Sequence, residues 1–177
     1  MMYKGAMRHE FTLSLPVTIR PARMDDIPQL EWFGMITPFR EILAKDFAAS
    51  QTGELVYLVA EVNDFPVGQV EADLIRFRDT GVGYIMALRV LPPFQNLGIG
   101  SGLMTAVEQA ICHQRLFVSQ LNVGKTNQVA QRLYKKLGYQ IVGEETTPWS
   151  YTTPQGEVKT IEEPELVMQK SLKEAGA

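Results

Sequence analysis

Cysteine and histidine are nearly absent from this chain, and no apolar run reaches the length of a membrane span. Of 177 residues, one is cysteine (Cys112) and two are histidine (His9 and His113). A single cysteine cannot form an internal disulfide, so nothing indicates an oxidising compartment and we expect a cytoplasmic protein. The histidines lack metal-ligand spacing, so no metal is expected. A membrane partner is not expected either, because a span needs about 20 apolar residues.

The net charge is also small. It is -3, from 17 Lys and Arg against 20 Asp and Glu, and this argues against a nucleic-acid partner because such proteins usually carry a basic stripe. The length and a hydrophobic content of 45% fit one domain with its own core. We expect this domain at residues 17–172, after an N-terminal extension (1–16) and before a C-terminal tail (173–177).

Hydrophobic periodicity predicts a mixture of strands and helices. Alternation bounded by turn residues predicts strands, and apolar residues at helical spacing predict helices. The predicted strands are 17–20, 55–62, 67–77, 83–90, 116–122, 139–143 and 166–172. The predicted helices are 24–33, 39–50, 101–114 and 127–137, and residues 144–164 are predicted to form a polar loop. This order predicts an α/β (α+β) fold, a mixed sheet with helices on its faces.

The most distinctive stretch is VLPPFQNLGIGSG, residues 90–102, where glycines alternate at the start of a predicted helix. A dinucleotide fingerprint fails, because Leu103 replaces its third glycine and no acid ends the next strand. A phosphate-binding loop at 124–126 fails too, because Ser119 stands where that motif requires glycine. The segment can instead cradle a pyrophosphate, since glycines let backbone N–H groups approach a ligand. On this segment alone, a turn that only connects strand and helix is an equal alternative.

Two motifs together resemble the GNAT superfamily of N-acetyltransferases. Leu88-x-Val90-x-Pro92, followed by Gln95-x-x-Gly98-x-Gly100, resembles the family's acetyl-coenzyme A motif. Asn127-x-x-Ala130-x-x-Leu133-Tyr134-x-x-Leu137-Gly138-Tyr139 resembles its second signature. The resemblance implies a largely antiparallel sheet of six or seven strands. In it, the strand at 84–90 carries a bulge and splays from the strand at 116–122, which leaves a gap for the pantetheine arm of the coenzyme.

The resemblance also implies which residues bind acetyl-coenzyme A. Main-chain groups of Leu88 and Val90 would bond to the pantetheine arm, and N–H groups between Gln95 and Ser101 would surround the pyrophosphate. Asn127 would reach the coenzyme from the opposite side. The full implied set is Leu88, Arg89, Val90, Gln95, Asn96, Leu97, Gly98, Ile99, Gly100, Ser101, Asn127, Ala130 and Tyr134.

The implied chemistry is direct attack of an amine on the thioester. The N–H of Leu88 is the expected donor to the thioester oxygen. Tyr134 matches the family tyrosine that protonates the leaving thiolate, although its spacing also fits a core tyrosine. Met86 stands where many members have a glutamate base, so the base is open. Glu71 and Asp73, on one face of the neighbouring strand, can act through a water or can be solvated strand residues.

The acceptor is the least determined part of the reaction. In the family, its pocket is shaped by the segment after the first helix and the loop before the last strand. Aromatic side chains there, with Glu144 and Glu145 nearby, suit a cationic amine, although Trp32 and Phe33 also fit a helix core. The candidate acceptor-binding residues are Trp32, Phe33, Asp73 and Trp149. We expect a small-molecule primary amine; the alternatives are a protein or peptide N-terminus, or a coenzyme-binding module with little catalysis. Relatives are often dimers, so a homodimer is also considered.

Overall fold

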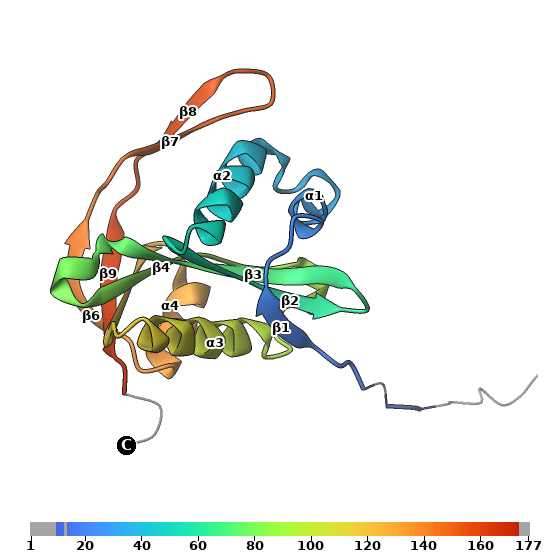
Figure 1. Cartoon of the computed structure of the whole chain (residues 1–177), viewed down its shortest axis with the longest axis horizontal. Helices are drawn as coiled ribbons and strands as arrows, with labels where there is room; N and C mark the ends of the chain where they lie inside the picture. The colour runs from blue at the N-terminus through green and yellow to red at the C-terminus, as the bar shows by residue number, and fades with distance from the viewer. Residues whose placement is uncertain (1–9, 13, 174–177) are drawn as a thin grey trace, which may run out of the picture.

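The chain folds into a seven-stranded sheet with helices on both faces (Figure 1). The structure, a computed structural model, describes residues 10–12 and 14–173, so most of the predicted N-terminal extension and C-terminal tail lies outside the described residues. The sheet order is β1-β2-β3-β4-β5-β9-β6. Every neighbouring pair is antiparallel except β4 and β5, which confirms the mixed, largely antiparallel sheet. The strands are Thr18–Pro21 (β1), Leu55–Val62 (β2), Phe65–Phe77 (β3), Val82–Val90 (β4), Val118–Gly124 (β5), Gln140–Glu145 (β6), Trp149–Thr152 (β7), Val158–Ile161 (β8) and Glu165–Ser171 (β9).

Two helical layers cover the sheet. In Figure 1, α1 and α2 lie on one face, and α3 and α4 lie on the other. Side chains of β3 alternate between these layers: Val70 and Ala72 join the core beneath α3, while Glu71 hydrogen-bonds to Asp46 of α2. In the described part of the chain, no helix is long and apolar enough to cross a membrane. The helices are Asp26–Gln29 (α1), Arg40–Gln51 (α2), Ile99–His113 (α3) and Gln128–Lys136 (α4).

Helix α3 packs an apolar stripe against the sheet. Leu103, Val107 and Ile111 lie one turn apart and are fully buried, and burial of each contributes roughly 1.5–3 kcal/mol. Gly83 of β4 permits this approach, because a Cβ added there would lie 2.7 Å from the side chain of Ile111. The first turn of α3 lies at the other end of β4, where an added Cβ at Gly100 would be 3.8 Å from Val90. The packing therefore fixes the helix N-terminus at the end of this strand.

Strands β4 and β5 are paired over only part of their length. The parallel pairing runs from Val82 to Ile85 of β4, although β4 continues to Val90. A β-bulge follows: between two successive pairs with β3, β4 advances by one residue more than its partner. Ala87, inside this bulge, has a φ of 53°. The splayed central pair and the bulge that the family resemblance implies are both confirmed.

The predicted helix at 24–33 is wrong beyond its first turn. Helix α1 has four residues, and the chain continues through short 3-10 turns at Trp32–Gly34 and Thr37–Phe39. Trp32 and Phe33 both have positive φ, 44° and 58°, and L-residues do not continue a right-handed helix in that conformation.

Distant partners explain this irregular segment. Asp26, the first residue of α1, accepts hydrogen bonds from the Arg20 guanidinium at 2.7 and 2.9 Å. Arg20 also pairs with Glu61 of β2. The indole N–H of Trp32 donates to the Pro66 carbonyl at 2.8 Å. These contacts join positions up to 41 residues apart, so local spacing does not reveal them.

The predicted polar loop at 144–164 contains a β-hairpin. Strands β7 and β8 pair from Trp149–Ile161 to Thr152–Val158. The N–H of Gly156 donates to the Thr153 carbonyl at 2.8 Å, and Gly156 has a φ of 83°. The hairpin contacts the rest of the molecule through an aromatic cluster, which we define as Phe39, Trp149 and Tyr151. Phe39 lies 4.6 Å from Tyr151 and 6.1 Å from Trp149 between ring centroids.

The close contact at Gly83 leads to a stability prediction. Gly83→Ala should lower the free energy of unfolding by about 1–3 kcal/mol, because the side chain of Ile111 must move to admit the methyl group. Gly143→Ala on β6 is the control, since its added Cβ meets nothing within 4 Å. Urea unfolding followed by circular dichroism measures both. Equal effects of the two substitutions would contradict the close packing of α3 on β4.

Candidate active site

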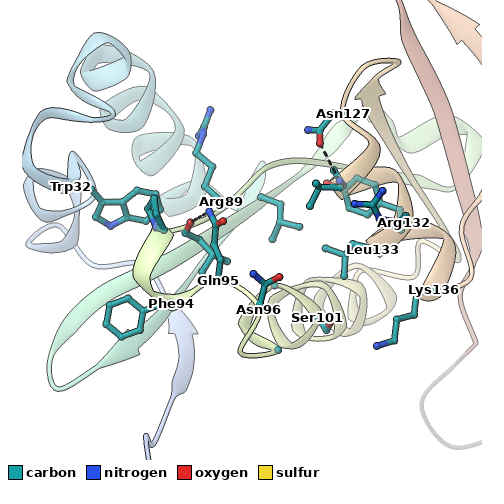
Figure 2. A pocket seen from close by; sticks show the side chains of 18 of the residues that line it. Trp32, Arg89, Phe94, Gln95, Asn96, Ser101, Asn127, Arg132, Leu133 and Lys136 are labelled. Atoms are coloured by element: carbon teal, nitrogen blue, oxygen red, sulfur yellow. Dashed lines mark hydrogen bonds between the residues drawn. The ribbon is translucent and has the colours of Figure 1, made fainter.

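A cleft of about 720 Å³ extends from the parted end of β4 to α4 (Figure 2). Four segments enclose it: the chain after α1, the end of β4, the turn that leads into α3, and α4. The lining residues are Trp32, Met35, Ile36, Leu88, Arg89, Val90, Pro92, Phe94, Gln95, Asn96, Gly98, Gly100, Ser101, Asn127, Val129, Ala130, Arg132, Leu133, Tyr134 and Lys136. The structure thus brings together eleven of the thirteen predicted coenzyme-binding residues. The two others, Leu97 and Ile99, do not line the cleft: Leu97 is 60% exposed and Ile99 is buried in the core.

The turn into α3 presents backbone donors to the cleft. Gly98, which precedes the helix, has a φ of 86°, a conformation that glycine adopts without strain. The N–H groups of the first helical turn have no partner inside the helix, and together with the helix dipole they attract anions. The side chain of Gln95 donates to the Val90 carbonyl at 2.9 Å. This bond ties the turn to the end of β4.

The exposed edge of β4 forms the floor of the cleft. Beyond Ile85, β5 no longer pairs with it, while Leu88, Arg89 and Val90 line the cleft. Backbone groups on this side therefore lack a strand partner, and unpaired backbone edges readily accept an added strand. An extended ligand can bond to this edge as a strand does.

Helix α4 forms the opposite wall. The side chain of Asn127 caps the helix, because its Oδ1 accepts a hydrogen bond from the Ala130 N–H at 3.1 Å. This leaves the Asn127 amide N–H₂ as a donor. Figure 2 shows Asn127, Arg132 and Lys136 on the α4 side of the cleft, across from Trp32 and Arg89. Arg132 and Lys136 add positive charge to that wall.

Tyr134 places one hydroxyl at this wall. Its side chain is buried, and burial raises the pKa of Tyr134 to about 12. Its ring packs edge-on against Tyr139, with 5.9 Å between centroids. Within residues 10–12 and 14–173, no group hydrogen-bonds to the Tyr134 hydroxyl. The group is therefore protonated at neutral pH and available to donate.

Glu71 lies outside the cleft lining, beneath α2. It is 1% exposed and shares a hydrogen bond with Asp46. Burial, and then the adjoining Asp46 carboxyl, raise the pKa of Glu71 well above its usual value. Burial also raises the pKa of Asp46, although the hydrogen bond from Glu71 favours its ionised form. This shared hydrogen bond stabilises the protonated form of Glu71 and the ionised form of Asp46, and we call these two residues the carboxyl pair.

The structure places the four predicted acceptor-binding residues in different surroundings. Trp32 is buried and lines the cleft, whereas Phe33 is 89% exposed and stacks on Phe65. Asp73 faces the same side of the sheet as Glu71, but its carboxylate already accepts the N–H groups of Ile75 and Arg76. Trp149 belongs to the aromatic cluster and does not line the cleft. Of these four residues, only Trp32 joins the coenzyme-side residues in one cavity.

Several lining residues were not predicted. Arg132, Leu133 and Lys136 lie beside Tyr134 on α4, so helical spacing within the second signature was a usable signal. Asp46 carried no such signal, because a carboxylate on a predicted helix is ordinarily a solvated residue.

Comparison with known proteins places the chain in a family. Residues 21–139 match the family model of the Acetyltransferase (GNAT) family. The chain belongs to this family.

The chain matches only part of the length of each of two relatives found by sequence. The chain is 42% identical over 81 residues to an uncharacterized N-acetyltransferase of Archaeoglobus fulgidus, covering 44% of this chain and 54% of that protein. It is 41% identical over 59 residues to an "N-terminal acetyltransferase complex ARD1 subunit homolog" of Leishmania donovani, covering 32% of this chain and 31% of that protein. The matches therefore span about a third to a half of these relatives.

Solved structures share the fold over almost the whole chain. The ribosomal-protein-S18-alanine N-acetyltransferase of Escherichia coli superposes with a TM-score of 0.66 at 18% identity, over 91% of this chain and 97% of that chain. The PaiA N-acetyltransferase of Thermoplasma acidophilum, in complex with coenzyme A, gives 0.67 at 18% identity, over 88% and 99%. At such identities the likeness shows the fold alone.

The turn at Gly98 leads to a binding prediction. Gly98→Ala should cost about 1–2 kcal/mol in the left-handed conformation, and relief of this strain would displace the donors of the first α3 turn. We expect the affinity for acetyl-coenzyme A, measured by calorimetry, to fall about tenfold or more. Gly53→Ala is the control, because Gly53 has a φ of 79° beyond the end of α2, away from the cleft. Equal affinity in the two variants would contradict a binding role for this turn.

The carboxyl pair leads to a prediction about pH. Because the pKa of folded Glu71 is raised, the folded state holds its proton more tightly than the unfolded state. Wild-type stability should therefore fall as pH rises from about 4.5 through the raised pKa. Glu71→Gln keeps a donor to Asp46 and removes this penalty, so its stability relative to wild type should increase between about pH 5 and pH 8.

Urea unfolding at both pH values measures this difference. Glu41→Gln, an exposed glutamate on α2, is the control, since its side chain has no burial penalty to lose. A Glu71→Gln difference that stays flat or declines with pH would show that Glu71 is ionised in the folded protein.

Proposed function

We propose that the protein transfers an acetyl group from acetyl-coenzyme A to a primary amine by direct attack, without a covalent enzyme intermediate. The observation that carries the proposal is the cleft itself. It joins an unpaired strand edge, the N-terminus of α3 and the Tyr134 hydroxyl. These three features suit an extended pantetheine arm, a pyrophosphate and a leaving thiolate, respectively. The coenzyme complex of the Thermoplasma protein supports the same cosubstrate for this fold.

In this proposal, two groups of the chain stabilise the reaction. The N–H of Leu88 lies at the bulge of β4 and is assigned as donor to the thioester oxygen, where negative charge develops. A donor so placed is worth about 3 kcal/mol. Tyr134 is assigned as the acid that gives its proton to the departing sulfur. Its raised pKa keeps the hydroxyl protonated at neutral pH, so it is present as a donor when negative charge develops on the sulfur.

The amine must lose a proton, and Met86 cannot accept one. Met86 pairs with Glu71 across β3 and β4, so the carboxyl pair lies on the neighbouring strand and on α2. The raised pKa of Glu71 favours its protonated form. We therefore assign the Asp46 carboxylate as the accepting group, with Glu71 holding it in place.

The acceptor class is part of the proposal. A small-molecule amine is our first assignment. Acetylation of a protein N-terminus is the second candidate, favoured by the ARD1-type relative and by the ribosomal-protein enzyme of the same fold. A module that only binds coenzyme A is disfavoured by the free Tyr134 hydroxyl. The cytoplasmic location and a homodimer stay predictions.

Replacement of Tyr134 tests the mechanism. Tyr134→Phe should lower kcat for thiol release with amine acceptors about 100-fold or more, while calorimetry shows unchanged binding of acetyl-coenzyme A. In the wild type, a pKa of about 12 for Tyr134 means that this acid causes no loss of rate between about pH 7 and pH 10.

Tyr139→Phe is the matched control, because its hydroxyl bonds to Ser119 and Glu108 outside the cleft. It should lower stability and leave kcat unchanged. Unchanged turnover in Tyr134→Phe would remove the acid from the mechanism. Failure of the wild type to consume acetyl-coenzyme A with any amine would remove the proposed function.

A further inference from the structure

Arg89 has a guanidinium group at the cleft that makes no hydrogen bond to the described residues. The residue lines the cleft and is half-buried, yet in residues 10–12 and 14–173 no acceptor hydrogen-bonds to its N–H groups and no carboxylate oxygen lies within 4 Å. Other arginines differ: Arg20 bonds to Asp26 and Glu61, and Arg40 bonds to Glu31. Five donors in a partly desolvated position are costly when they have no acceptor.

The aromatic cluster fixes the position of this group. The guanidinium carbon lies 5.6 Å from the centroid of the Phe39 ring. Arginine held on a ring keeps its edge free to bind a planar anion with two parallel hydrogen bonds. This arrangement suits a carboxylate.

A second free donor lies beside Arg89. Gln69 is its partner across β3 and β4. The Oε1 of Gln69 accepts a hydrogen bond from the Tyr57 hydroxyl at 3.0 Å, but its buried Nε2 has no acceptor among the described residues. Two neighbouring side chains on one face of the sheet thus carry N–H groups that no described residue accepts.

The carboxyl pair lies on the same face, a short distance along β3. Glu71 follows Gln69 by two residues, which is about 7 Å along a strand, and Arg89 interacts electrostatically with both Glu71 and Asp46. The guanidinium of Arg89 and the carboxyl pair therefore lie near each other on one face of the sheet.

We propose that Arg89 is a specificity residue that binds a carboxylate of the acceptor, so that the acceptor is a free α-amino acid. The inference rests on the proposed function and narrows it. The amine lies toward the carboxyl pair and the α-carboxylate lies on the guanidinium of Arg89. A peptide N-terminus lacks that carboxylate, because the next residue converts it to an amide. Trp32, Ile36 and Phe94 line the same cleft and favour an apolar side chain on the acceptor.

Matched acceptors test this assignment. L-Leucine and L-phenylalanine are compared with their amides, and with isopentylamine and 2-phenylethylamine, which lack the carboxyl group. With acetyl-coenzyme A at saturation, kcat/KM for the free acids should exceed that for the other compounds about 10- to 100-fold, the range for a hydrogen bond to a charged group. In Arg89→Gln this ratio should fall to about one, and Arg89→Lys should keep an intermediate ratio.

Arg76→Gln is the control variant. Arg76 also stacks on aromatic rings, 4.5 Å from the centroid of Tyr84 and 5.1 Å from that of Phe77, but it does not line the cleft. It should keep the wild-type ratio. Calorimetry with acetyl-coenzyme A shows whether the Arg89 variants retain a folded coenzyme site.

The outcomes separate the two proposals. If the wild type turns over amides, plain amines or peptides as well as the free acids, or if Arg76→Gln lowers the ratio as much as Arg89→Gln, the assignment is overturned. If no amine is acetylated, binding of L-leucine and of isopentylamine is compared by NMR in the presence of coenzyme A. Arg89-dependent binding of leucine alone would then keep this inference and reject the proposed function. Binding of neither compound would reject the inference.

Discussion

The structure depends on the separation of β4 from β5 after Ile85. A parallel pair normally satisfies backbone groups along its whole length, and an interrupted pair leaves a row of them unbonded. The bulge at Ala87 turns the end of β4 away from β5, and the contact of Gly83 with Ile111 holds α3 against the same strand. An unsatisfied strand edge and an unsatisfied helix N-terminus therefore meet in one cleft. The strand edge and the helix N-terminus can both donate hydrogen bonds to a ligand without a change in the backbone.

The face beneath α2 has a different physical character. There the sheet carries Gln69, Glu71 and Arg89 where an apolar layer would be more stable, since buried polar groups cost free energy unless they are fully bonded. One Glu71 oxygen and the Gln69 amide nitrogen have no hydrogen-bond partner among the described residues. Proteins tolerate such groups chiefly where function requires them. The polar layer supports our proposal of a charged acceptor.

Local signals accounted for most of the fold and for most of the cleft lining on the side where we expect the coenzyme. The strand at 55–62 was predicted with the bounds that the structure shows. The turn before α3 was also predicted, because glycine residues indicate where the backbone can adopt a positive φ. The segment around Trp32 was missed because Arg20, Glu61 and Pro66, all distant in sequence, override its helical spacing. The β7–β8 hairpin was missed because its strands have only four residues each and lie in a stretch rich in threonine and glutamate.

This contrast has a physical basis. A pyrophosphate and a pantetheine arm are held largely by main-chain groups, and a short motif of glycines and a strand end suffices to present them. An acceptor is selected by side chains, and those come from α2, β3, β4 and the chain after α1, which only the finished fold brings together. Asp46 illustrates the difference, because its partner Glu71 lies 25 positions later on another element. A sequence motif can therefore indicate the cosubstrate, whereas the acceptor that we propose rests on contacts, such as that of Arg89 with Phe39, which only the fold reveals.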